Sequence, residues 1–221
     1  MNKECPFCED LELHGINARE IVDRRLADSR FIFAQSKHFN ATADLYPVLD
    51  DPYFLITPRD HYNNFRDIER KEEMADIMQY LQTITGKPSV VSFEHGETED
   101  GKKVQSVYHA HTHCIYTDRD YLSPAMGILK GLGFNPKAIT FKEPYVNGEA
   151  PREGSYYTFR QGENGIVIPE GEIEIPSQFF RVVMEEIEKP DTPYPNWKDL
   201  HEDEARLMEQ RLQNLPLGEL V

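Results

Sequence analysis

The stretch SVYHAHTHCIY, residues 106–116, places three histidines, His109, His111 and His113, at every second position. Successive side chains of a β-strand point to opposite faces of the sheet, so this alternation is typical of a strand. We therefore predict one long strand over residues 104–116, with the three imidazoles on one face. An imidazole can serve as a nucleophile or a metal ligand, and it changes charge near neutral pH. Three charged rings on one face would repel one another, so we expect the three histidines to have different roles.

The segments before and beside this strand predict a protein of the α+β class. Runs rich in β-branched and aromatic residues predict further strands at residues 19–26, 30–35, 53–57 and 89–94. Apolar side chains three and four positions apart predict an amphipathic helix over residues 64–84. The charged, glycine-containing segment HGETEDGKK joins strand 89–94 to the histidine strand. We expect these two strands to pair and the segment between them to form an exposed loop.

The residues after Asp118 predict a further set of strands and helices. The segments SYYTFRQ and GIVIPEG, at residues 155–161 and 165–171, predict a strand pair joined by a GENG turn. Further helices are predicted over residues 176–188 and from His201 onward. We predict that residues 1–118 form one domain that carries the chemistry, and that residues 119–221 form an extension packed against it.

The net charge and the apolar runs of the chain indicate which classes of binding partner to expect. The 221 residues carry a formal net charge of −15. Because an acidic surface repels phosphate backbones and anionic lipids, we expect neither a nucleic acid nor a membrane as the main partner. No apolar run approaches the roughly 20 residues that span a bilayer. The N-terminus, MNKECPFCED, has no apolar run of a signal peptide, so we expect a cytoplasmic protein.

The histidine stretch and the CPFC segment each allow more than one interpretation. The histidines could form a solvated polar ridge, or a His-x-His pair could bind the metal of a metal-dependent hydrolase. The CPFC segment at residues 5–8 is typical of a tight zinc chelate, since zinc favours four soft or borderline ligands in a tetrahedron. A redox-active Cys-x-x-Cys needs a strand before it and a helix after it, and nothing precedes this motif that could form the strand. Two unpaired cysteines are the third interpretation.

The histidine stretch resembles the His-φ-His-φ-His-φ-φ signature of the histidine-triad (HIT) family of nucleotide hydrolases and transferases. The segment FLITPRDH, residues 54–61, is similar to the family's hydrophobic strand that ends in Pro-Lys-x-His, and CPFC matches a Cys-x-x-Cys found in many members. The resemblance covers about residues 4–117. It implies a HIT-like antiparallel β-sheet with a flanking α-helix, here followed by a C-terminal α/β extension.

The resemblance also implies the chemistry of two of the histidines. In the family, the central histidine attacks the α-phosphorus of a nucleotide and forms a nucleotidyl-histidine, which implies that His111 is the nucleophile. A backbone carbonyl should then hold the proton of its other ring nitrogen. His113 is placed to hydrogen-bond a phosphate oxygen or the leaving group.

Four further residues are expected to bind the nucleotide by the same resemblance. Ser106 matches a serine that contacts the phosphate, although its position has the parity of the opposite face, and Gln105 has the parity of the histidines. Asp44, before Pro47, matches a ribose-binding aspartate. Tyr53 stands where many members have a histidine, and it keeps the ability to hydrogen-bond.

Zinc-containing members of the family complete the Cys-x-x-Cys site with two histidines. Carried over, the predicted structural zinc ligands are Cys5, Cys8, His61 and His109. Members commonly form homodimers, so a homodimer is a further expectation.

The C-terminal segment PSQFFRVV, residues 176–183, resembles an extension of some larger members. In it, Gln178 or Arg181 could reach a phosphate, but a helix that packs Phe179 and Val183 on the core is the favoured interpretation.

The resemblance predicts a nucleotide hydrolase that acts on a phosphoramidate, a dinucleoside polyphosphate or a similar nucleotide. Two alternatives remain. A nucleotidyltransferase or phosphorylase would use the same intermediate, and a nucleotide-binding regulatory protein would have no significant turnover.

Overall fold

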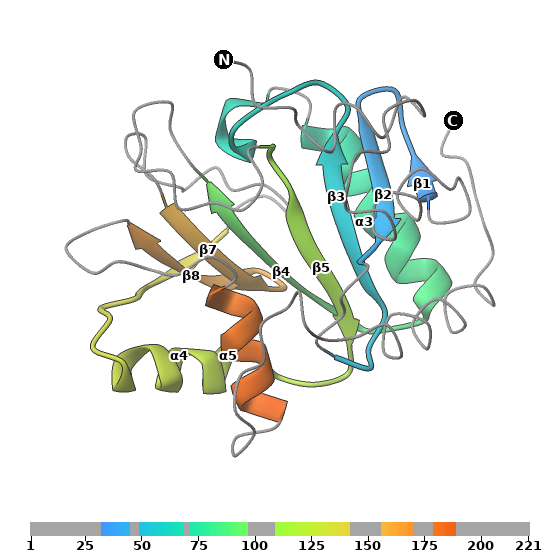
Figure 1. The fold of residues 1–221 in the computed structure, drawn as a ribbon. Coiled ribbons are helices and arrows are strands. Elements are labelled where there is room, and N and C mark those ends of the chain that lie inside the picture. Colours follow the sequence, from blue (N-terminus) through green and yellow to red (C-terminus); the bar gives the residue numbers. More distant parts are fainter. Residues whose placement is uncertain are drawn as a thin grey trace, which may run out of the picture.

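The computed structural model describes residues 32–44, 49–68, 71–96, 109–141, 156–169 and 179–188. The predicted strand 19–26, the helix from His201 onward, and the site residues Cys5, Cys8, Gln105 and Ser106 lie outside these ranges. The elements in chain order are β1 (Ile32–Gln35), β2 (Phe39–Ala43), β3 (Tyr53–Pro58), the 3-10 turn η2 (Phe65–Asp67), α3 (Lys71–Thr85), β4 (Ser89–Gly96), β5 (Thr112–Thr117), α4 (Leu122–Gly131), β6 (Lys137–Thr140), β7 (Tyr156–Gln161), β8 (Asn164–Pro169) and α5 (Phe179–Glu188) (Figure 1).

The strands form one sheet of eight in the order β1-β2-β3-β5-β4-β7-β8-β6, and every pairing is antiparallel. The expected pairing of strand 89–94 with the histidine strand is confirmed as β4 with β5. The predicted pair at residues 155–161 and 165–171 is confirmed as β7 and β8. The α+β class with an antiparallel sheet and a flanking helix is therefore confirmed. Because β4 also pairs with β7, the sheet continues without a break past residue 118 into the C-terminal half. The division into two domains at that residue stays a prediction.

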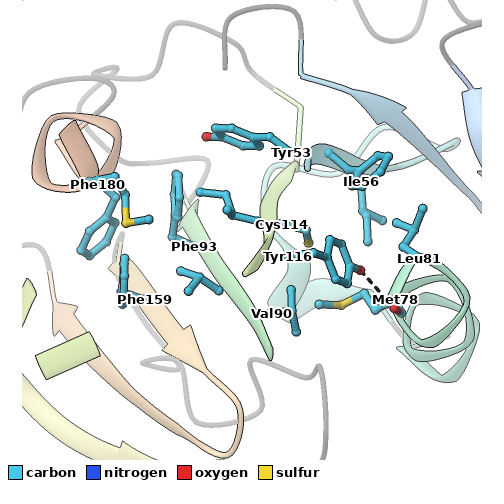
Figure 2. Packing of buried hydrophobic residues seen from close by; sticks show 14 of the residues in the cluster. Tyr53, Ile56, Met78, Leu81, Val90, Phe93, Cys114, Tyr116, Phe159 and Phe180 are labelled. Atoms are coloured by element: carbon cyan, nitrogen blue, oxygen red, sulfur yellow. Dashed lines mark hydrogen bonds between the residues drawn. The ribbon is translucent and has the colours of Figure 1, made fainter. Parts of the chain in front are cut away.

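Helix α3 covers one face of the sheet. Its apolar side chains at positions 74, 77, 78 and 81 are buried, as the spacing predicts. The Tyr116 hydroxyl donates a hydrogen bond to the Met78 carbonyl, which ties the helix to β5 (Figure 2). Gly86 ends the helix with φ of 64°, a left-handed conformation that glycine adopts readily. The helix begins at Lys71, later than predicted, because a separate 3-10 turn capped by Asn64 occupies residues 65–67.

Helix α5 packs on the opposite face. The Phe180 ring lies 5.8 Å from that of Phe93 on β4 and 5.1 Å from that of Phe159 on β7 (Figure 2). Phe179 packs on Tyr157 of β7 with ring centroids 6.3 Å apart. Such aromatic pairs contribute about 0.5–1.5 kcal/mol each beyond their burial. The helix predicted over residues 176–188 is therefore present over 179–188, and its aromatic side chains fix it on the face of the sheet that carries His113.

The long regular strand predicted over residues 104–116 is wrong in its central part, because β5 begins only at Thr112. The backbone N–H of Ala110 instead donates to the Tyr62 carbonyl at 2.6 Å, and the His109 ring contacts the Pro58 carbonyl. Residues 109–111 thus turn from the sheet ladder toward the chain that follows β3. Strand β2, helix α4 and strand β6 were not predicted. No helix among the described residues has the length and apolar character that a bilayer crossing requires.

Candidate active site

His113 lies at the centre of a buried polar cluster on the α5 face of the sheet. It stands on β5 opposite Leu55 of β3 and Phe93 of β4. Only 8% of the surface of this residue is exposed. The Phe93 ring stacks on the imidazole with centroids 4.5 Å apart. Nδ1 of His113 lies 2.9 Å from the Tyr53 hydroxyl and 3.3 Å from Oδ2 of Asp44. Burial lowers the pKa of His113, and the Asp44 carboxylate partly opposes this shift.

Asp44 follows β2 directly and is 3% exposed. Its Oδ2 accepts a hydrogen bond of 3.0 Å from Nη1 of Arg181, which is 4% exposed and belongs to α5. The Arg181 guanidinium also lies over the Tyr53 ring, 5.6 Å from its centroid. The structure therefore brings two of the predicted nucleotide-binding residues, Asp44 and Tyr53, to the third histidine of the triad. It also brings Arg181 there from the C-terminal half of the chain.

A hydrogen bond made by His111 shows which of its two ring nitrogens carries the proton. Nδ1 lies 2.8 Å from the carbonyl oxygen of His109, and a carbonyl can only accept, so Nδ1 carries the proton and Nε2 keeps its lone pair. Burial lowers the pKa of His111 to about 4, with the neighbouring His113 as the next cause. The ring is therefore neutral near pH 7. Its centroid lies 5.3 Å from that of His113.

His109 is fully buried and faces a different neighbourhood. Its Nε2 donates to the Pro58 carbonyl at 2.8 Å, which leaves the lone pair on Nδ1. The His61 ring lies 5.1 Å away, edge to face. Burial lowers the pKa of His109 to about 4. Metal-binding histidines commonly donate their second ring N–H to a backbone carbonyl, so the donor set of this pair fits a metal site. Within the described ranges alone, no group of three or more histidine, cysteine or acidic side chains is arranged to hold a metal ion.

His95 is a fourth imidazole near the triad that the sequence prediction did not include among the site residues. Phe93 pairs with His113, so two residues further along antiparallel β4 the chain reaches the level of His111. The His95 ring stacks on Tyr157 of β7 with centroids 4.0 Å apart. Burial lowers the pKa of His95 to about 4, and the proximity of His111 adds to the shift. The parity of His95 on the strand that pairs with the histidine strand is the signal that would have found it.

Glu94, beside it, points to the other face of the sheet. Its side chain is 1% exposed and accepts hydrogen bonds from the Phe65 backbone N–H at 2.8 Å and from the Tyr156 hydroxyl at 3.1 Å. The carboxylate therefore has a structural role in joining η2 to β7, and it does not face the histidines.

Comparison with known proteins found no matching family model and no matching curated protein. Solved structures similar to the chain include a Hit-like protein involved in cell-cycle regulation from Bartonella henselae, with 17% identity and a TM-score of 0.31 over 39% of this chain and 68% of that one. Yeast Ap4A phosphorylase Apa2 in complex with AMP has 13% identity and a TM-score of 0.39 over 62% of this chain and 57% of the phosphorylase. A uridylyltransferase has 10% identity and a TM-score of 0.42 over 96% and 92% of the two chains.

At these identities and TM-scores, the functional interpretation of the chain rests on the histidine motif and on the geometry of the site.

Proposed function

We propose that the protein is a nucleotide-processing enzyme of the histidine-triad type that hydrolyses a bond at the α-phosphorus of a nucleotide, with His111 as the nucleophile. The observation that carries this proposal is the hydrogen bond from Nδ1 of His111 to the His109 carbonyl. Because this bond places the proton on Nδ1, the lone pair of the neutral ring lies on Nε2, and such a lone pair is the condition for nucleophilic catalysis by an imidazole. The neighbouring His113, 5.3 Å away between ring centroids, supplies a second polar group for the same phosphate.

The proposed reaction has two steps. In the first, Nε2 of His111 forms a bond to the α-phosphorus, and the bond from phosphorus to the leaving group breaks. The leaving group takes the electron pair and accepts a proton from solvent. In the second step, a water oxygen attacks the phosphorus, the P–N bond breaks, and its electron pair returns to Nε2. The water loses a proton to solvent, and the products are the nucleoside monophosphate and the leaving group.

The same intermediate could be transferred to another acceptor. If inorganic phosphate takes the place of water in the second step, the enzyme is a phosphorylase, and the product is a nucleoside diphosphate. Product analysis with and without inorganic phosphate separates the two reactions. A regulatory protein without turnover predicts a third result, in which nucleotide affinity is measurable but no product forms.

The experiment is incubation of the full chain with nucleoside phosphoramidates, a dinucleoside polyphosphate and a nucleotide sugar, followed by intact-mass measurement. We expect a nucleotidyl adduct that accumulates most in a His113→Ala variant and is absent in His111→Gln. The matched control is His38→Gln, because His38 lies at the turn between β1 and β2 and contacts Glu73 at 2.7 Å, away from the triad. No adduct and no product across the panel, with nucleotide affinity unchanged in His111→Gln, would favour the binding protein.

We also propose a structural zinc ion held by Cys5, Cys8, His61 and His109. Support comes from the proximity of the two imidazoles and from the Pro58 carbonyl that leaves Nδ1 of His109 with its lone pair. When bound, zinc would supply folding free energy by joining the N-terminal motif to the chain that follows β3. No step of the proposed reaction passes through the metal.

A further inference from the structure

One carboxylate oxygen joins three parts of the chain that are distant in sequence. Oδ2 of Asp44 lies 3.0 Å from Nη1 of Arg181 and 3.3 Å from Nδ1 of His113. Asp44 and Arg181 are separated by 137 positions in the sequence. Their exposed fractions are only 3% and 4%. Burial of a charged group is costly unless it is paired, so each member of this pair allows the other to be buried at the site.

The pair has a direct consequence for the His113 ring. A carboxylate can only accept hydrogen bonds, so the arrangement at Asp44 favours the proton on Nδ1 of His113, where the Tyr53 hydroxyl also makes contact at 2.9 Å. The two ring nitrogens lie on different edges of the imidazole. With Nδ1 turned into the protein, Nε2 is the nitrogen that can face a substrate.

Arg181 keeps this arrangement in place. Without a cation nearby, a buried carboxylate tends to take up a proton, and a protonated Asp44 could donate to His113 instead of accepting from it. The guanidinium beside Asp44 favours the ionised carboxylate, and it is itself placed over the Tyr53 ring by α5. The adjacent Phe180, packed on Phe93 and Phe159, fixes the position of the helix.

We infer that Asp44 and Arg181 are positioning residues for His113, and that helix α5 of the C-terminal half completes the active site by supplying Arg181. Asp44 then acts on the imidazole, where the family resemblance alone assigns it to the ribose. The inference rests on the proposed function for its effect on catalysis, but its effect on the His113 ring can be measured without any substrate.

The experiment compares Asp44→Asn, Arg181→Met, Arg181→Lys and the double variant Asp44→Asn/Arg181→Met in the full chain. The matched control is Val183→Ala, because it removes part of a buried apolar side chain of α5 and leaves both members of the pair in place. Two-dimensional ¹H–¹⁵N spectra of the histidine side chains report the tautomer of each ring. We expect His113 to be protonated on Nδ1 in the parent and in Val183→Ala, and to become a mixture of tautomers in Asp44→Asn and Arg181→Met.

Kinetics supply the second readout. Misplacement of a catalytic group by about 1 Å can cost on the order of 10²-fold in rate, so we expect kcat to fall by about that factor in Asp44→Asn and Arg181→Met with a small change in KM. The double variant should have a kcat no lower than that of the less active single variant, because the two residues act as a unit. Arg181→Lys, which keeps the charge, should retain part of the activity.

A ribose contact predicts different results. If Asp44 binds ribose, Asp44→Asn should raise KM for ribonucleotides and leave 2′-deoxynucleotides unaffected, whereas positioning of His113 predicts equal losses for both. An unchanged His113 tautomer in whichever of Arg181→Met and Asp44→Asn folds would overturn the inference. If the tautomer changes in these variants but the parent protein has no activity on the panel, only the proposed function is overturned.

Discussion

The ring of Phe93 on β4 stacks on the ring of His113 on β5, with centroids 4.5 Å apart and 17° between the planes. The two residues are direct cross-strand partners in the sheet. Phe93 also packs against Phe180 of α5 (Figure 2). One apolar ring therefore contacts both the third histidine and the C-terminal helix. The position of His113 therefore depends on the hydrophobic core as much as on its polar partners.

We expect Phe93→Leu to loosen His113 as well as the core. The substitution removes the aromatic stack and part of a buried side chain, so the free energy of unfolding should fall by about 1–3 kcal/mol. Activity should fall as well, because the imidazole loses one of its supports. Urea unfolding and steady-state kinetics measure the two effects.

Phe159→Leu is the control for Phe93→Leu. Phe159 belongs to the same aromatic cluster and stacks on Phe93 at 6.2 Å, but it stands one strand further from the histidines. A comparable loss of stability with little loss of activity is expected. Equal losses of activity in both variants would show that core stability alone, and not the stack on His113, explains the effect.

His95 gives a prediction about the phosphate. Its ring lies flat against Tyr157 and near His111, and it is neutral because burial lowers its pKa to about 4. We expect His95 to hydrogen-bond the substrate phosphate. A neutral hydrogen bond contributes about 0.5–1.5 kcal/mol, so His95→Phe, which retains an aromatic ring but removes both nitrogens, should raise KM about 2- to 13-fold. Tyr157→Phe, which keeps the stacked ring and removes only the hydroxyl, should leave KM near the parent value. If His95→Phe has the KM of the parent, His95 does not contact the substrate.

Two glycines give a test of the packing of the fold. A Cβ on Gly96, at the end of β4, would meet the Tyr156 ring, whereas one on Gly127 in α4 would meet nothing within 4 Å. Tyr156 is fully buried and donates to Glu94, so it cannot move without loss of that hydrogen bond. We expect Gly96→Ala to lower the free energy of unfolding by about 1–3 kcal/mol. Gly127→Ala should raise it by up to about 1 kcal/mol, since alanine favours helix. Thermal or urea unfolding measures both, and equal stabilities would contradict the packing at Tyr156.

The elements with strong local patterns were predictable from the sequence. The apolar spacing in α3, the β-branched and aromatic run in β4 and the turn between β7 and β8 each depend on residues close together in the chain. Strand β2 escapes prediction because FNATA combines Phe39 and Thr42 with an asparagine and two alanines, which are depleted in strands. Its pairing with β3 decides its structure. Residues 109–111 left the predicted strand because their hydrogen-bond partners, the Pro58 and Tyr62 carbonyls, are about 50 residues away in sequence.

In the candidate site too, residues of a local motif were predictable and contacts made by tertiary packing were not. His111 and His113 were predictable because the motif is contiguous, and the carbonyl partner of His111 lies two residues away. The ion pair of Asp44 with Arg181 was not, because it depends on the packing of α5 on the sheet, which no local pattern encodes. The sequence favours a helix that packs on the core, with contact of Arg181 to a phosphate as the alternative. The structure combines core packing of α5 with a buried arginine at the site.

The zinc proposal can be tested by metal analysis of the purified full chain. Thiolate and imidazole ligands in the expected set bind zinc tightly, so the parent protein should contain about one zinc ion per chain after dialysis. Cys8→Ser and His109→Ala should each lower the zinc content and the melting temperature, and a chelator should lower the melting temperature of the parent but not of these variants. Cys114→Ala is the matched control, because Cys114 is buried on the α3 face of β5 and is not a predicted ligand, so it should retain the metal. A parent without bound zinc, unaffected by the chelator, would refute the proposal while the assignment of His111 as nucleophile could still be tested by the adduct experiment.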